Sequence, residues 1–345
     1  MDTLTHALSG MLLARTTAPA APRPDRLDMR SRLLAGFLAA AFPDSDFVIR
    51  FFSDALTYLN LHRGVTHSLP LLPLWAVLLS FAFALLWRRR YPWRAFYGVT
   101  LASLFLHVCG DVITAYGTMV LAPFSDYQMA LPAIFIIDPW FSAIIVAGLL
   151  AAWGWRSRLP AVAGLVLLTG YVALQTWQME QARDLGARLA AARGVAAVDV
   201  VALPQPLSPF NWKIIVRDAH GFHVADVNML RRAAAPEATG TAGFFVRLAA
   251  LYRPRNDLRW NYYPQFGSGE EQTAVARTAW QAEALAGMRR FAWYPALHAL
   301  ELRAAGACAW FSDLRFELRA IRNPFVFGVC RDGDKGAWRL DRLEG

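Results

Sequence analysis

Histidines and carboxylates occur in closely spaced pairs in the first third of the chain. His62 and His67 enclose the stretch HRGVTH, and His107 lies four residues before Asp111 in LHVCGD. A separation of four residues places both side chains on one face of a helix. An ionisable pair inside an apolar segment is costly unless it faces a partner or a wet cavity. We therefore predict that His107 and Asp111 belong to a functional site.

Further carboxylates and a histidine stand beside two shorter apolar segments. Asp2 and His6 open the first segment in MDTLTHALSG. Asp44 and Asp46 follow the second in AAFPDSDF, where Pro43 ends a helix and the i,i+2 spacing can aim both carboxylates at one point. Such mixed nitrogen and oxygen ligands suit Zn²⁺ or a centre of two metals. The predicted metal ligands are Asp2, His6, Asp44, Asp46, His62, His67, His107 and Asp111.

Simpler interpretations exist for several of these residues. Asp2 can cap a helix, Asp44 and Asp46 can shape a turn, and His67 can lie at the water interface. The geometry of HRGVTH is also predicted: Gly64 permits a tight bend, which places His62 in a loop and His67 in the first turn of a span.

A divalent cation held by these ligands would lower the pKa of water and polarise an ester. Zinc is the favoured ion, as one ion or as two or more in adjacent positions. Arg63 and Asp46 are the predicted catalytic residues, and the guanidinium of Arg63 suits the neutralisation of a phosphate oxygen. One class of function is therefore a membrane-embedded metal-dependent hydrolase of a phosphoester or lipid headgroup, which the surplus of ligands over the four of a structural zinc site and the family resemblance described below favour.

A second class of function uses the same ligands without catalysis. The cation could stabilise a membrane scaffold, or it could be bound for transport. The two classes differ in coordination, because a catalytic site keeps a position open to water whereas protein ligands close a structural site.

The elements that carry these residues are predicted from long runs without charge. Hydrophobic residues make up 56% of the 345 residues and charged residues only 18%, which indicates a membrane protein. The runs that can form spans of about 20 residues cover 68–87, 95–125, 134–155 and 159–179. A soluble helical core is the alternative, but it would need a very large partner surface to cover four such runs.

The distribution of arginines predicts the orientation. Segments 4–14 and 33–42 are too short to span and are interpreted as a half-depth helical hairpin. Its loop is basic, as are 88–94 and 156–158, and short basic loops stay in the cytoplasm. The arginines of the hairpin loop are Arg15, Arg23, Arg26, Arg30 and Arg32. The chain beyond the fourth span is then extracytoplasmic, and all predicted ligands lie on the side away from the basic loops.

The net charge of +9 does not indicate a nucleic-acid partner. The excess is spread thinly along the chain, and no basic run is interleaved with aromatic residues as a phosphate-tracking groove requires. Membrane lipid is the predicted partner.

The second half is predicted to be a separate domain, with residues 1–178 forming the membrane metal-site domain and 179–345 an α+β domain. Segments rich in β-branched and aromatic residues predict strands at 195–203, 212–218, 222–228, 308–318 and 325–331. One helix is predicted at 270–291. His220, His223 and His298 show no ligand spacing and are interpreted as surface or strand residues.

Two cysteines of the second half leave an alternative open. Cys308 and Cys330 could pair in an oxidising compartment, although two cysteines without a pattern are more often buried thiols. The predicted fold class is thus an α-helical integral membrane core followed by a small α+β extramembrane domain. The core has about four transmembrane helices and two short half-depth helices.

Several motifs together resemble the YdjM/YbcI-like inner-membrane metal-dependent hydrolases. They are MDTLTHALSG, FPDSD, HRGVTHS, LH-x-x-x-D followed by TAYGT, and APFS ahead of IIDP. The resemblance is close over residues 1–145 and extends in outline to LPQPLSPFNWKIIV. It implies a multi-pass protein of the bacterial inner membrane and a metal-dependent hydrolase, distantly similar to zinc-dependent phospholipase C. The family's polar motif residues fall on Asp2, His6, Asp44, Asp46, His62, Arg63, His67, His107, Asp111 and Asp138.

Overall fold

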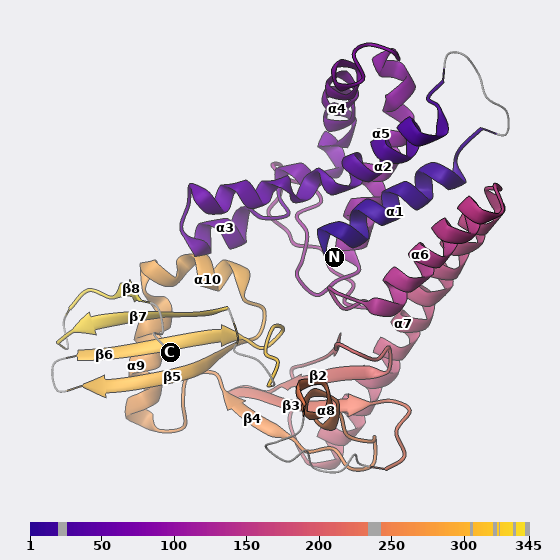
Figure 1. The fold of residues 1–345 in the computed structure, drawn as a ribbon. Coiled ribbons are helices and arrows are strands. Elements are labelled where there is room, and N and C mark those ends of the chain that lie inside the picture. The colour runs from indigo at the N-terminus through magenta and orange to yellow at the C-terminus, as the bar shows by residue number, and fades with distance from the viewer. Residues whose placement is uncertain are drawn as a thin grey trace. The chain divides into compact units, whose positions relative to one another are not determined.

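The computed structural model describes residues 1–19, 26–233, 243–303, 306–319, 323, 325–333 and 336–341. Arg23 of the predicted basic loop lies outside these residues. The chain divides into two compact units (Figure 1). The helical unit comprises Met1–Asp54 and Leu61–Trp177, and the sheet unit comprises Ala55–Asn60 and Gln178–Gly345. The predicted fold class is confirmed, since a helical region with apolar helices precedes a domain of two antiparallel sheets.

The helical unit consists of short helices and long apolar helices joined by turns. Its elements are α1 (Thr3–Thr16), α2 (Met29–Ala41), η1 (Pro43–Phe51), η2 (Val65–His67), η3 (Leu69–Leu71), α4 (Leu72–Leu86), α5 (Trp93–Val112), α6 (Pro139–Gly154) and the first part of α7 (Leu159–Ala192). The short helix α3 (Ala55–Leu61) interrupts this series and belongs mainly to the sheet unit.

Three helical stretches of the described residues are long and apolar enough to cross a membrane, compared with the four predicted spans. They are Leu69–Leu86, Trp93–Val112 and Leu159–Ala192. The predicted run 134–155 contains α6, which has only 16 residues because Asp138 caps the helix and Pro139 occupies its first turn. The run 95–125 ends as a helix at Val112, and its remainder forms a loop in which Thr118 pairs with Met129.

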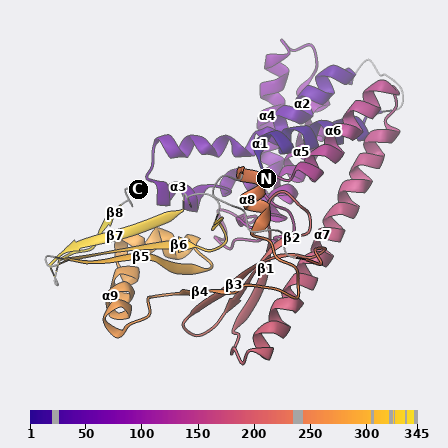
Figure 2. The same ribbon diagram turned by 60° about the horizontal axis from the view of Figure 1, so that its bottom comes forward.

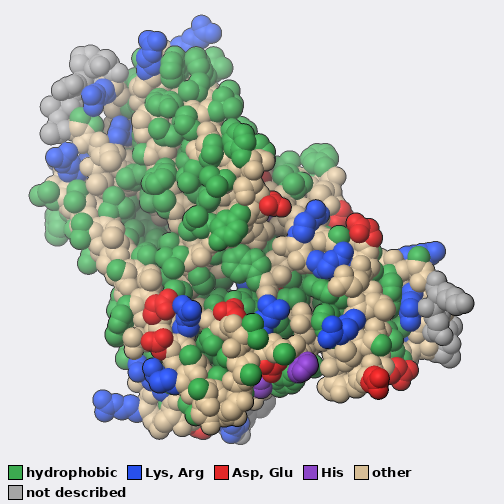
Figure 3. Space-filling model, turned by 180° about the vertical axis from the view of Figure 1, so that it is seen from behind, with side chains coloured by type: hydrophobic (Ala, Val, Ile, Leu, Met, Phe, Trp, Pro, Cys, Tyr) green, Lys and Arg blue, Asp and Glu red, His purple; other side chains and the backbone are tan. Residues whose placement is uncertain are grey.

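The outer sides of the apolar helices carry exposed aliphatic residues, among them Leu78 on α4 and Leu150 on α6. Figure 3 shows hydrophobic side chains covering much of the helical unit, whereas charged side chains are scattered over the sheet unit. An apolar helix surface of this kind is expected to face lipid.

The predicted hairpin of two short helices corresponds to α1 and α2, which touch through their backbones. A Cβ atom at Gly10 would lie 2.3 Å from the carbonyl oxygen of Gly36, and one at Gly36 would lie 2.6 Å from that of Gly10. Neither position can carry a larger residue without separating the helices. Both helices also pack against α5. This packing fixes the ends of α1 and α2 beside the histidine and carboxylate of α5.

The sheet unit contains two four-stranded antiparallel sheets (Figure 2). The first is formed by β1 (Asp199–Pro204), β2 (Asn211–Arg217), β3 (Gly221–Asn228) and β4 (Asn261–Pro264). The second is formed by β5 (Pro295–Arg303), β6 (Gly306–Asp313), β7 (Val326–Asp332) and β8 (Arg339–Asp341). The last turns of α7 pack on the first sheet, where Ala182 and Ala190 contact the same core as Trp212 and Ile214.

The helices of this unit differ from the single helix predicted at 270–291. That segment forms α9 (Glu270–Gln281), η4 (Glu283–Leu285) and α10 (Ala286–Phe291), and α8 (Phe244–Ala250) was not predicted. Helix α9 packs on the second sheet through Trp280, whose ring centroid lies 4.8 Å from that of Phe311. The predicted strand 308–318 ends at Asp313, because the carboxylate of Asp313 accepts a hydrogen bond from the backbone of Arg315 and closes a turn.

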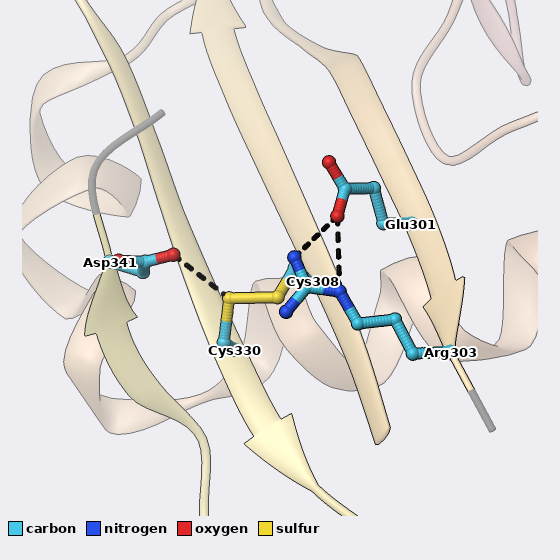
Figure 4. The surroundings of a disulfide bond; sticks show 5 residues. All are labelled: Glu301, Arg303, Cys308, Cys330 and Asp341. Atoms are coloured by element: carbon cyan, nitrogen blue, oxygen red, sulfur yellow. Dashed lines mark hydrogen bonds and ion pairs between the residues drawn. A yellow bond between two sulfur atoms is a disulfide. The ribbon is translucent and has the colours of Figure 1, made fainter. Parts of the chain in front are cut away.

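Cys308 and Cys330 form a disulfide (Figure 4). They are directly opposite each other on β6 and β7. The paired interpretation therefore holds, and the more frequent interpretation, two buried thiols, is wrong for this chain. Periodicity alone could not show this, because it does not give the register between two strands.

Candidate metal centre

Four of the predicted ligands converge in the helical unit. Asp44, His67, His107 and Asp111 each offer one ligand atom, and these atoms all lie within 4.8 Å of one another. Asp44 belongs to η1, His67 to η2, and the other two to adjacent turns of α5. The i,i+4 spacing on α5 thus supplies two candidate ligands, and the two short 3-10 helices supply one each.

The distances between the candidate ligand atoms lie on both sides of those around a single small cation. Nε2 of His107 lies 3.0 Å from Nε2 of His67 and 3.4 Å from Oδ2 of Asp111. Oδ2 of Asp111 lies 3.0 Å from Nε2 of His67. Oδ1 of Asp44 lies 3.6 Å from Nε2 of His107 and 3.9 Å from Nε2 of His67. A tetrahedral zinc site with bonds of about 2.0–2.2 Å has ligand separations of about 3.3–3.6 Å.

Hydrogen bonds orient both imidazoles toward this centre. Nδ1 of His107 donates to the carbonyl oxygen of Ala40 at 2.6 Å, so its Nε2 carries the free lone pair. Nδ1 of His67 contacts Oγ1 of Thr66 at 2.9 Å. Metal-bound histidines are typically held by such a bond from the second ring nitrogen.

One buried oxygen at the centre lacks a well-aligned hydrogen bond. Oδ2 of Asp111 accepts none, although the whole side chain is buried. A buried acceptor without a hydrogen bond is unfavourable, and a cation would relieve this cost. The donor set, the orientation of both imidazoles and this oxygen therefore fit a divalent metal ion.

The other oxygen of Asp111 is surrounded by donors. Oδ1 lies 3.0 Å from Nη2 of Arg63 and 3.0 Å from Nε2 of His6, and it contacts the amino group of Met1. Arg63 also donates to Oγ1 of Thr114 at 2.9 Å. Its side chain is buried beside Asp111, whereas the sequence predicted a guanidinium facing a phosphate oxygen.

Asp46 and His62 form a second pair beside the centre. Nδ1 of His62 donates to Oδ1 of Asp46 at 2.7 Å, and the backbone N–H of Arg63 donates to Oδ2 at 2.9 Å. Burial opposes ionisation of Asp46, but the hydrogen bond and charge of His62 outweigh burial and lower the pKa of this carboxyl. Oδ2 lies 3.7 Å from Nδ1 of His67, so Asp46 links the two histidines.

The tight bend in HRGVTH requires Gly64, as predicted, because a Cβ atom there would lie 2.8 Å from the carbonyl oxygen of Leu61. Arg63 contributes to the same bend with a left-handed backbone, with φ of 61°. His62 lies in the loop after α3 as predicted, whereas His67 ends η2 just before the apolar run that begins at Leu69. Hydrogen bonds at both ends of the Arg63 backbone, to Asp46 and from Met119, hold this conformation.

Besides Arg63, Asp46 and His62, three further motif residues lie outside the group of four. Asp2 caps α1, and its two oxygens accept hydrogen bonds from the N–H and hydroxyl of Thr5. His6 contacts Asp111 and stacks on His107 with ring centroids 3.7 Å apart. Asp138 caps α6 and accepts a hydrogen bond from the hydroxyl of Tyr171 at 2.9 Å.

Supporting residues were not predicted as part of the site. Thr3 donates to Oδ2 of Asp44 at 2.6 Å, and Thr66 and Ala40 hold the two ligand histidines. Thr66 could have been found from its place inside HRGVTH. Ala40 acts through a backbone carbonyl, for which a sequence gives no signal.

The geometry defines a helical membrane protein with a cluster of two histidines and two aspartates at one end of its apolar helices. Residues 1–182 match the family described as YdjM inner membrane protein, and the chain belongs to this family. A curated relative is the uncharacterized protein YfhP of Bacillus subtilis (strain 168). It is 28% identical over 231 residues, which cover 65% of this chain and 67% of the relative. No solved structure matches the chain significantly.

Proposed function

We propose that the protein is a membrane-embedded hydrolase that uses one divalent metal ion, zinc in the first instance, to cleave a phosphoester or a lipid headgroup. The observation that carries this proposal is the convergence of two imidazole nitrogens and two carboxylate oxygens on one centre, where a buried oxygen of Asp111 has no hydrogen bond. A bound divalent ion would supply an activated water and a polarised ester oxygen.

A single ion is favoured over two by the surroundings of Asp111. A bridging carboxylate would have to offer its Oδ1 to the second ion. That oxygen already faces the guanidinium of Arg63 at 3.0 Å, and a second cation there would be repelled. We assign Arg63 the role of balancing the charge of Asp111 and fixing its orientation.

The site has a less buried side, which is where an ester could enter. The side chain of Asp44 is 12% exposed and that of His62 is 16% exposed, whereas those of His67, His107 and Asp111 are fully buried. Asp46, predicted as a catalytic residue, holds His62 at this side. We assign Asp46 the positioning of His62 and of the HRGVTH loop.

One observation favours a non-catalytic function as the second candidate. Four protein ligands suffice to complete a tetrahedral zinc site, and a closed site of this kind stabilises a fold. The protein would then be a metal-stabilised membrane scaffold. Catalysis instead requires that the ion accept a further ligand on the side of Asp44.

The disulfide supports a location of the sheet unit outside the cytoplasm. Disulfides persist in oxidising compartments and are rare in the cytosol. Together with the basic loops at 88–94 and 156–158, the bond between Cys308 and Cys330 supports several membrane crossings with the sheet unit outside the cytoplasm. Impermeant labelling of single cysteines tests this orientation. A cysteine at Ala219, which is exposed in the turn before β3, should react on intact cells, one at Arg90 should not, and the reverse pattern would contradict this orientation.

The central experiment combines metal analysis with hydrolysis assays on a panel of phospholipids. The purified protein should contain about one equivalent of divalent metal, and His107→Ala should lose the metal while it still inserts into membranes. His223→Ala is the matched control, because His223 pairs with Asp218 in the sheet unit and should retain the metal. Metal-dependent hydrolysis supports the enzyme. One equivalent of metal without turnover on any ester would select the scaffold.

A further inference from the structure

The short helix η1 has two chemically different sides. Its inner side carries Asp46, which is buried and bonded to His62, together with the metal-ligand candidate Asp44. Its outer side exposes large apolar side chains. They are Phe47, Val48 and Phe51, with Phe52 directly after the helix. Phe51 is 73% exposed and Phe52 is 84% exposed, values that are unfavourable for phenylalanine in water.

The depth of η1 follows from its contacts with the metal centre. Asp44 shares the centre with His107 and Asp111, which lie in the last turns of α5 before it ends at Val112. His67 lies two residues before the apolar run Leu69–Leu86. The centre therefore lies at the ends of two helices long enough to cross a membrane. The outer side of η1 must lie at the same level, where a hydrocarbon core gives way to headgroups.

The composition of the outer side matches that depth. Aromatic and aliphatic side chains flank the exposed Arg50 on both sides in the sequence. Segments that lie in the membrane interface place rings at the boundary of the acyl chains, while arginine reaches the lipid phosphates. Helix α4, which follows η2 and η3 in the chain, also exposes aliphatic residues, namely Leu74 and Leu78.

We propose that the outer side of η1 inserts into the lipid headgroup layer beside the metal centre. The anchor consists of Phe47, Val48, Arg50, Phe51 and Phe52. The occupant of this surface is lipid, and the anchor holds the exposed side of the site within the headgroup layer. Its consequence for substrate choice rests on the proposed function, because a lipid headgroup could then reach Asp44 and His62 without leaving the membrane.

Electron paramagnetic resonance of a spin label at position 51 tests the anchor directly. The label is attached to Phe51→Cys in a Cys109→Ala background, in vesicles of zwitterionic and anionic phospholipids. Cys109 is the free cysteine, and the disulfide does not react with the label. Collision rates with oxygen, which partitions into lipid, are compared with those of a water-soluble nickel chelate. Leu78→Cys serves as the lipid control and Ala274→Cys, on the exposed side of α9, as the water control.

If the outer side of η1 lies in the headgroup layer, the ratio of oxygen to nickel collision rates at position 51 should be several-fold higher than at position 274. It should be lower than the ratio at position 78. A label at Phe52→Cys should give the same result if the first variant does not fold. A ratio equal to that at 274 would place η1 in water, and exclusion of both reagents would show that protein covers it. Either result overturns the proposal.

The same labelled protein separates this proposal from the proposed function. His107→Ala should abolish metal binding without changing the collision ratio at position 51, because the exposed apolar side chains, and not the cation, hold the outer side of η1 in lipid. If no ester is hydrolysed but the ratio is intermediate, the hydrolase proposal fails and the anchor stands. If esters are hydrolysed but the ratio equals that of the water control, the anchor fails and the hydrolase stands.

Discussion

Both units bury charged groups, but the partners of these groups differ between the two units. In the sheet unit, Arg315 pairs with Asp313 at 2.8 Å and also donates to the carbonyl oxygen of Phe291. Lys213 donates to the carbonyl oxygens of Leu314 and Glu317. In the helical unit, two imidazole nitrogens and two carboxylate oxygens face one another. The charged groups of the sheet unit are satisfied by their own partners, whereas the ligand-type atoms of the helical unit converge on one another, which is the arrangement behind the proposed metal site.

The largest effect is expected from removing one partner of the buried ion pair between Asp313 and Arg315 in the sheet unit. Asp313→Ala leaves the guanidinium of Arg315 buried without its carboxylate, which should lower the free energy of unfolding of the sheet unit by about 3–5 kcal/mol. Denaturant titration followed by tryptophan fluorescence measures the change.

Glu301→Ala is the matched control on β5, since Glu301 and Arg303 form an exposed pair (Figure 4). Exposed pairs contribute about 0–1 kcal/mol. Equal losses in both variants would contradict the distinction between the buried and the exposed pair. Metal content should not change in either.

The next largest effect is expected from the convergent cluster itself. Asp111→Asn keeps the shape of the side chain but removes the charge at the metal centre, so metal affinity should fall more than 100-fold, or about 2.7 kcal/mol. Competition with a chromophoric chelator measures the affinity. Asp138→Asn is the matched control, because Asp138 caps α6 and lies outside the group of four. A loss of affinity in the control as large as in Asp111→Asn would count against the assigned ligands.

A smaller loss of metal affinity is expected from the residue that supports the ligands. Asp46 contacts His62, Thr66 and the backbone of Arg63. Asp46→Asn should lower the affinity about 10–100-fold, as is usual for residues that orient a metal ligand. The same chelator competition applies. A loss equal to that of Asp111→Asn would make Asp46 a direct ligand.

The closeness of His107 and Asp111 was the most predictable part of the candidate site, because their i,i+4 spacing depends only on helical geometry. The sequence could not separate Asp44, which joins the cluster, from Asp2, which caps α1, because the two aspartates look alike until tertiary contacts form. Arg63 was placed in the site, but its partner Asp111 lies 48 residues away, and such a contact leaves no local pattern.

Secondary structure was predicted best in the long hydrophobic runs. The segment PALHALELR was missed as β5 because its leucines, alanines and glutamate favour a helix, and pairing with β6 overrides that preference. Strand β8 was missed because three residues carry no periodicity. The late start of α6 depends on Asp138 and Pro139, a capping signal within an otherwise apolar run.

The smallest effect is expected from a carboxylate with ordinary partners. Asp28 caps α2 by accepting from the N–H of Ser31 at 2.7 Å and from the hydroxyl of Tyr91 at 2.8 Å. The bond from Ser31 is the main cause of its lowered pKa, and Tyr91 adds to it. Asp28→Ala should cost about 1 kcal/mol at neutral pH.

This contribution should depend on pH with a definite sign. Because the pKa of Asp28 is lower in the folded protein, the carboxylate stabilises the fold fully above its ordinary pKa of about 3.9. The difference in unfolding temperature between wild type and Asp28→Ala should therefore shrink as the pH falls below 4. A difference that grows on acidification would contradict the assigned cap.

The hydrogen bond from His107 to the carbonyl oxygen of Ala40 has a consequence for mutational scanning. No substitution at position 40 removes that oxygen, so a scan of side chains cannot detect the acceptor that orients the ring of His107. The position will still score as intolerant, because the Cβ atom of Ala40 lies close to where Gly10 would carry one. A scan would record a steric requirement there. Replacing the peptide bond after Ala40 by an ester, which weakens the acceptor, would reveal its chemical role.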